Sequence, residues 1–81
     1  MLIRFAGKAV ADYAGAPADV RKAFNKQLAL LLANMRHPSL HAKKYSEAEN
    51  IWQARVNRNW RFYFTIHGDA YEIITIIPHP K

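Results

Sequence analysis

Residues 51–81, IWQARVNRNWRFYFTIHGDAYEIITIIPHPK, constrain the fold of this chain more than any other segment. Aromatic and β-branched residues dominate the segment, as is typical of pleated strands that bury one face. Two polar breaks interrupt it, one at residues 57–59 (NRN) and one at residues 68–69 (GD). The segment therefore predicts three consecutive antiparallel strands joined by two short connections.

Side chains alternate between the two faces of a strand, so the register of the first two strands can be worked out. A three-residue connection sets Val56 across from Trp60 on the apolar face, and the same register sets two arginines, Arg55 and Arg61, across from each other on the polar face. Like charges that face each other are destabilising, so we expect either a salt bridge with a nearby glutamate or a bound anion there. We expect no other segment to cover the polar face, which holds Gln53, Arg55, Arg61, Tyr63 and Thr65.

The third strand follows a two-residue connection that begins with glycine, a combination that favours a tight hairpin turn. Its register sets Ile73 across from Phe64 on the apolar face. Further along, the same register sets Ile77 across from Trp60. It assigns three residues to the polar face: Glu72, Ile74 and Ile76. Prolines interrupt regular pairing after this strand, so alternation assigns no face to His79.

The first half of the chain predicts one strand and two helices. Residues 1–6 are a short strand candidate, and residues 7–15 suggest one or two helical turns. A longer helix is expected from residue 17 to about residue 35, where apolar residues recur at helical spacing: Val20, Phe24, Leu28, Leu31, Leu32 and Met35. Residues 37–44 are expected to form a basic loop. The whole chain, residues 1–81, therefore predicts one α+β domain of order β-α-α-β-β-β, with a small antiparallel sheet and two helices on one face.

The formal net charge of +6 favours a polyanion or an acidic protein as partner over an accidental excess of surface cations. The absence of cysteine excludes a disulfide framework and a thiolate metal site. His37 and His41 have the spacing of helical metal ligands, but Pro38 lies between them and disfavours such a site. Residues 28–33, the most apolar run, are too short to span a membrane, and no signal peptide is evident, so we expect a cytoplasmic protein.

These features together resemble the RelE/ParE superfamily of bacterial toxin–antitoxin systems. The resemblance rests on the leading strand, the segments LALLLANMRHPSLHAKKY and WQARVNRNWRFYF, and the terminal IITIIPHPK, and it covers essentially the whole chain. Its most specific part is Arg55, followed by the turn and the strand residues 60–63 (WRFY). RelE-like members are metal-independent endoribonucleases that cut mRNA, commonly in the ribosomal decoding site, and an antitoxin holds them inactive. ParE-like members share the fold and act on DNA gyrase.

The resemblance also implies roles for individual residues. Arg61 corresponds to a phosphate-contacting arginine of the family and Arg55 to its partner on the preceding strand, whereas His79 falls where several nucleases of the family carry a catalytic histidine. RNA is cut without metal when its 2′-hydroxyl attacks the adjacent phosphate, which requires a base, an acid and positive charge. An imidazole and two guanidinium groups can supply these. Around them we expect four residues to contact RNA: Lys43, Lys44, Tyr63 and Lys81.

Three functions remain open at this point. The first is an mRNA endoribonuclease, the second a ParE-like inhibitor that binds gyrase, and the third an inactive homologue that acts by forming an antitoxin complex. His79 and Arg61 favour the nuclease, because binding alone does not need an imidazole. Ile51 and Gln53 stand where RelE carries strand lysines, which favours the other two. We expect the nuclease, without a cofactor or metal, with an antitoxin, mRNA and the ribosome as partners and no membrane.

Overall fold

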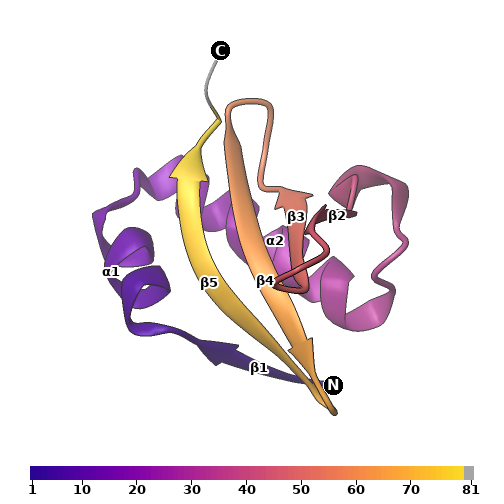
Figure 1. The fold of residues 1–81 in the computed structure, drawn as a ribbon. Coiled ribbons are helices and arrows are strands. Elements are labelled where there is room, and N and C mark those ends of the chain that lie inside the picture. The colour runs from indigo at the N-terminus through magenta and orange to yellow at the C-terminus, as the bar shows by residue number, and fades with distance from the viewer. Residues whose placement is uncertain (80–81) are drawn as a thin grey trace.

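The computed structural model describes residues 1–79 and contains a five-stranded sheet with two helices (Figure 1). In chain order the elements are β1 (Leu2–Phe5), α1 (Gly7–Gly15), α2 (Ala18–Ala33), the 3-10 turn η1 (Pro38–Leu40), β2 (Lys43–Ser46), β3 (Ile51–Arg55), β4 (Trp60–His67) and β5 (Ala70–Pro78). The strand order across the sheet is β1-β5-β4-β3-β2. Figure 1 shows α2 crossing behind the sheet and α1 beside β5. The expected α+β class is confirmed.

The core lies between α2 and the apolar face of the central strands. The ring of Phe24 on α2 meets the ring of Phe62 on β4 edge-on, with centroids 5.2 Å apart. Alternation along β3 and β4 was predicted correctly, since Ala54 pairs with Phe62 and both are buried. Full burial of a large apolar side chain such as Phe62 stabilises the fold by about 1.5–3 kcal/mol. The large side chains that are almost completely buried are Phe24, Phe62, Phe64, Leu31, Leu40 and Ile73.

The buried stripe of α2 differs from the prediction at two positions. Leu32 was expected in the stripe, but 43% of it is exposed, whereas Gln27 is only 6% exposed. Gln27 lies seven residues after Val20 and so shares its face of the helix. Its amide nitrogen donates to the carbonyl oxygens of Ser39 at 3.0 Å and of Arg55 at 2.9 Å, so the polar group is satisfied inside the core. No helix within residues 1–79 has the length and apolar character needed to cross a membrane.

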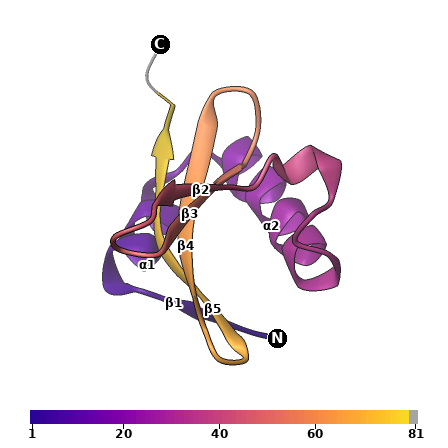
Figure 2. The ribbon, with the colours of Figure 1, turned by 45° about the vertical axis from the view of Figure 1, so that its right-hand side comes forward.

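Two features of the sheet correct the sequence prediction. β1 pairs in parallel with β5, so the sheet is mixed and not wholly antiparallel. β2 was expected to belong to a loop, but it pairs with β3 as an antiparallel edge strand, which brings the sheet to five strands. Short and lysine-bearing sequences are common at sheet edges, where no alternation of apolar residues marks them. The tip of the β2–β3 hairpin points away from α2 (Figure 2).

The β4–β5 hairpin begins as predicted and then changes register. Gly68 has a positive φ of 57°, as a turn with glycine first requires, and Phe64 pairs with Ile73. Between Tyr63 and Phe64 the register shifts by one residue of β5, so that Arg61 pairs with Ile77. The predicted pairing of Ile77 with Trp60 is therefore wrong. Ile76, which was expected on the polar face, is only 2% exposed and belongs to the core.

Helix α1 holds β5 just beyond the end of β1. A carboxylate oxygen of Asp12 accepts hydrogen bonds from the Thr75 hydroxyl at 2.6 Å and the Ile76 amide at 3.0 Å. Lys8 adds a salt bridge to the same oxygen at 2.9 Å. Burial alone would raise the pKa of Asp12, but the hydrogen bonds from Thr75, Ile76 and Lys8 outweigh it and lower that pKa. Beyond the end of β1, the Asp12 carboxylate thus takes the place of a strand carbonyl as the acceptor for the Ile76 amide.

Candidate functional site

A pocket of about 450 Å³ opens where β3, β4 and the end of β5 meet the segment before β2. Its lining residues are His41, Ala42, Lys43, Gln53, Ala54, Arg55, Arg61 and His79. Three of these side chains are cationic and two carry imidazoles, and none of the described lining residues is acidic. Such a pocket attracts an anion.

The two arginines lie across from each other, as the sequence predicted. Arg55 pairs with Arg61 in the β3–β4 ladder, where opposite Cα atoms are about 5 Å apart. One amino group of Arg61 donates to the carbonyl oxygen of Asn57 at 2.8 Å and to that of Trp60 at 2.9 Å, which fixes the guanidinium against the turn. Partial burial and then the charge of Arg55 lower the pKa of Arg61, whereas Tyr63 acts in the opposite direction. The surroundings therefore disfavour a cation there, and a bound anion would relieve this.

No carboxylate among residues 1–79 forms a salt bridge with either arginine. Glu72, one of the two glutamates that could have paired with Arg61, lies instead 3.9 Å from the imidazole of His67, near the β4–β5 turn. The Nε atom of Arg55 is buried and has no hydrogen-bond partner within the described part of the chain. A buried donor without a partner costs about 1–3 kcal/mol. Because the atom is closed to solvent in this structure, a phosphate oxygen could satisfy the donor only after the Arg55 side chain shifts within the pocket.

Arg55 also lines a second pocket, of about 480 Å³, on the side of α2. Lys26 of α2 and Arg58 of the β3–β4 turn contribute two further cations to its lining. The described residues around this pocket again include no acid. Positive charge therefore continues across Arg55 from one pocket into the next, which suits a chain of phosphates better than a single small anion.

The β3–β4 turn contacts both the side chain of Arg61 and the backbone of His79. The side-chain oxygen of Asn57 accepts from the backbone amides of Asn59 and Trp60, each at 2.9 Å, which is the arrangement of an Asx turn. The amide of His79 donates to the carbonyl oxygen of Asn59 at 2.7 Å. Figure 1 shows this turn and the end of β5 at the same end of the molecule. After the register shift in β5, Ile77 lies across from Arg61, and His79, two residues further along, lines the pocket.

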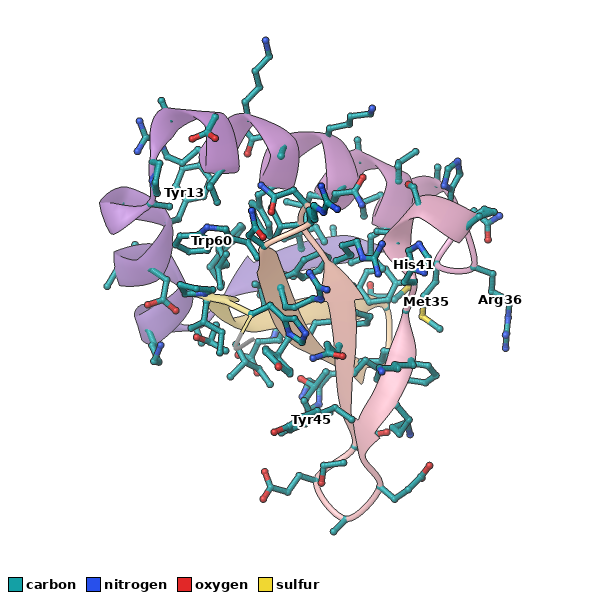
Figure 3. The ribbon with its side chains drawn as sticks, turned by 90° about the horizontal axis from the view of Figure 1, so that it is seen from above. Tyr13, Met35, Arg36, His41, Tyr45 and Trp60 are labelled. Atoms are coloured by element: carbon teal, nitrogen blue, oxygen red, sulfur yellow. The ribbon has the colours of Figure 1, made fainter. Side chains whose placement is uncertain are left out.

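His41 is a pocket residue that sequence reasoning missed. It follows η1 with a left-handed backbone, φ 47°, and lies beside the start of β2 (Figure 3). Its spacing from His37 was the only signal in the sequence. His37 instead accepts a hydrogen bond from the amide of Ser39 at 3.2 Å, and no group of metal ligands occurs in residues 1–79. The position of His41 near His79 follows from the tertiary fold, and no local pattern predicts it.

The expected RNA-contacting residues separate into two groups. Lys43 lines the pocket, and Tyr63 lies next to it, since its hydroxyl accepts from the amide of Gln53 at 2.8 Å. Lys44 points to the other face, where its amine lies 4.8 Å from the centroid of the Trp52 ring. Lys81 lies outside the described residues. The structure thus brings Arg55, Arg61, His79 and Lys43 together and leaves Lys44 apart.

Comparison with known proteins yields structural likeness only. Neither a protein-family model nor a curated protein sequence matches the chain. A YoeB/ParE toxin from Agrobacterium tumefaciens superimposes with a TM-score of 0.82 at 15% identity, over 99% of this chain and 100% of that one. The chain has the RelE/ParE fold.

Two further solved structures agree with this RelE/ParE fold. YoeB from Staphylococcus aureus, solved as a dimer, has a TM-score of 0.81 at 20% identity, with 99% of this chain and 98% of that one covered. RelE from Pyrococcus horikoshii, solved in complex with RelB, has a TM-score of 0.78 at 12% identity, with 95% and 92% covered. The fold implied by the sequence resemblance is therefore confirmed.

Proposed function

We propose that this protein is the toxin of a type II toxin–antitoxin module and that it cleaves ribosome-bound mRNA without a metal ion. The observation that carries the proposal is the convergence of Arg55, Arg61 and His79 on one pocket whose described lining contains no acid. Like charges are kept facing each other there, and the buried Nε donor of Arg55 has no partner in the described part of the chain, residues 1–79. An RNA phosphate supplies what both features lack.

In the proposed reaction, the 2′-hydroxyl of a nucleotide attacks the phosphorus that links it to the next nucleotide. A base removes the hydroxyl proton, the bond from phosphorus to the 5′-oxygen breaks, and an acid protonates that oxygen. The products are a 2′,3′-cyclic phosphate and a 5′-hydroxyl. His79 serves as the base or the acid, because an imidazole exchanges protons near neutral pH. Arg55 and Arg61 hold the non-bridging oxygens and stabilise the charge that develops on them.

The proposed partner is a cognate antitoxin. The RelE of similar fold was solved together with RelB, and YoeB of Staphylococcus aureus was solved in a heterotetramer with YefM. The net charge of +6 on this chain supports an acidic partner that competes with RNA for the same cations. The proposed assembly is therefore a hetero-oligomer in which the toxin is inactive.

Mapping the 5′ ends of cellular mRNA by primer extension after induction tests the nuclease directly. Wild-type protein should produce discrete new ends, and Arg61→Ala and His79→Ala should each abolish them and relieve growth arrest. Arg36→Ala is a matched control, since this exposed arginine lies outside the pocket, and it should behave as wild type. Growth arrest that persists in both pocket variants, with loss of plasmid supercoiling and intact mRNA, would instead establish inhibition of gyrase by binding.

A further inference from the structure

Tyr45 stands out on the surface that borders the pocket. It is 62% exposed although it belongs to a strand of the sheet. The β2–β3 register shifts between Lys44 and Ser46, so Tyr45 occupies an irregularity of the kind that re-aims a side chain. Its ring meets that of Tyr63 at a centroid distance of 4.9 Å and an interplanar angle of 74°. Figure 3 shows Tyr45 well away from α2.

The supporting ring is fixed and continuous with the pocket. The hydroxyl of Tyr63 accepts a hydrogen bond from Gln53 at 2.8 Å, and Gln53 lines the pocket. Lys43, two residues before Tyr45, lines the same pocket and pairs with Gln53 across the β2–β3 ladder. An edge-to-face contact leaves at least one face of each ring uncovered by the other. An aromatic surface with a braced neighbour therefore adjoins a cationic pocket.

We propose that Tyr45, braced by Tyr63, is a stacking platform for a nucleobase of single-stranded RNA whose adjacent phosphate occupies the pocket. The proposal rests on the proposed function, and it names how that site holds its substrate. Proteins that bind single strands combine cationic grooves with aromatic rings, because every base has a face on which a ring can stack. Because stacking does not read the hydrogen-bonding edge of a base, we expect the protein to bind RNA with any base at this position.

The surroundings of Tyr45 favour a base over a protein partner. The other exposed large apolar side chains among residues 1–79 lie in β1, α1, α2 or at Met1, so they do not extend this surface into a wider apolar patch. Aromatic anchors of protein interfaces cluster near the centre of a larger, well-packed contact area. The ring pair of Tyr45 and Tyr63 beside Lys43 and Gln53 matches the needs of one nucleotide.

The test uses His79→Ala protein, so that cleavage plays no part, and a fluorescent single-stranded 2′-O-methyl RNA as probe. Tyr45→Ala should weaken binding roughly 5- to 100-fold, the range expected for loss of one stacked base. Tyr45→Phe keeps the ring and should bind as the parent does, whereas Tyr45→Leu should resemble Tyr45→Ala. The dependence of the affinity on salt should be the same in all variants, because no phosphate contact is lost.

A second arm identifies what the ring contacts. In the parent, replacing one nucleotide of the probe with an abasic site should weaken binding at a single position, and in Tyr45→Ala that effect should vanish. Unchanged RNA affinity in Tyr45→Ala, with weakened antitoxin binding, would overturn the platform and assign the ring to a protein partner. The proposed nuclease is tested separately: if mRNA cleavage is confirmed while Tyr45→Ala binds RNA and cleaves as wild type, only the platform fails. If no RNA is cleaved but RNA binding still depends on Tyr45, the nuclease proposal fails and the stacking platform is supported.

Discussion

The two faces of the β3–β4 ladder differ in what they contribute: one is part of the apolar core, and the other carries two facing arginines. On the covered face, Ala54 and Phe62 are buried against the ring of Phe24. On the open face, the adjacent residues Arg55 and Arg61 face each other, and the buried Nε donor of Arg55 has no hydrogen-bond partner within residues 1–79. Neighbouring residues of the same strands thus serve stability on one side and carry an electrostatic cost on the other. We expect a bound anion to offset this cost on the open face.

The largest effect is expected on the covered face. Phe62→Ala should reduce the free energy of unfolding by about 3–5 kcal/mol, because it removes a fully buried ring and leaves a cavity beside Phe24. Urea denaturation followed by circular dichroism measures this. A loss below about 1 kcal/mol would mean that the core is not where the strands place it.

The open face should respond far less. Without ligand, Arg61→Ala should change stability by no more than about 1 kcal/mol, because the removal of a facing like charge offsets the loss of its hydrogen bonds to Asn57 and Trp60. With a single-stranded 2′-O-methyl RNA at 100 times its Kd, wild-type protein should gain about 2.7 kcal/mol, and Arg61→Ala should lose most of that gain. Thermal melts with and without the RNA compare the two. Equal stabilisation of both proteins would contradict an anion site at Arg61.

Asp12 should make stability depend on pH on the acid side only. Its pKa is lowered in the fold, so its contribution is fully present above the unfolded value of about 3.9 and is lost as pH falls through the lower folded value. Asp12→Asn should therefore cost about 1–2 kcal/mol at pH 7 and flatten the acid limb of the stability curve. Asp19→Asn, at an exposed carboxylate in the first turn of α2, serves as control. An unchanged acid limb in Asp12→Asn would contradict the role of this carboxylate.

The smallest effects are expected for substitutions of two adjacent lysines, Lys43 and Lys44. Lys43 lines the pocket, whereas Lys44 lies on the opposite face over Trp52. Lys43→Ala should lower RNA affinity and reduce its salt dependence by about one phosphate contact, while Lys44→Ala should cost only about 0.5–1 kcal/mol of stability. Affinity measured over a series of salt concentrations distinguishes them. Equal losses of RNA affinity would show that RNA reaches both faces of β2.

The sequence allowed one half of this site to be predicted. Apolar alternation along β3 and β4, with a three-residue connection between them, was enough to set Arg55 across from Arg61. His79 depended on a register shift in β5 that local pattern does not reveal. The run 73–77 (IITII) has almost no polar residue to distinguish its faces, so an extra residue there leaves no trace in the sequence.

The remaining parts depend on contacts far apart in the chain. β2 becomes a strand because β3 offers it an edge, since its own residues (KKYS) have little apolar character. His41 reaches the pocket because η1 turns the chain there, with Leu40 buried beneath it. Parallel pairing of β1 with β5 joins residues about 70 positions apart, and nothing local specifies it.

Nuclear magnetic resonance can show whether Arg55, Arg61 and His79 act on one phosphate, as we propose. A short single-stranded 2′-O-methyl RNA is titrated into isotope-labelled protein while the arginine Nε–H and histidine ring signals are followed. The signals of Arg55, Arg61 and His79 should shift together with one dissociation constant, and that of Arg36 should stay in place. Shifts confined to arginines outside the pocket, or none at Arg55 and Arg61 under saturating RNA, would contradict the account.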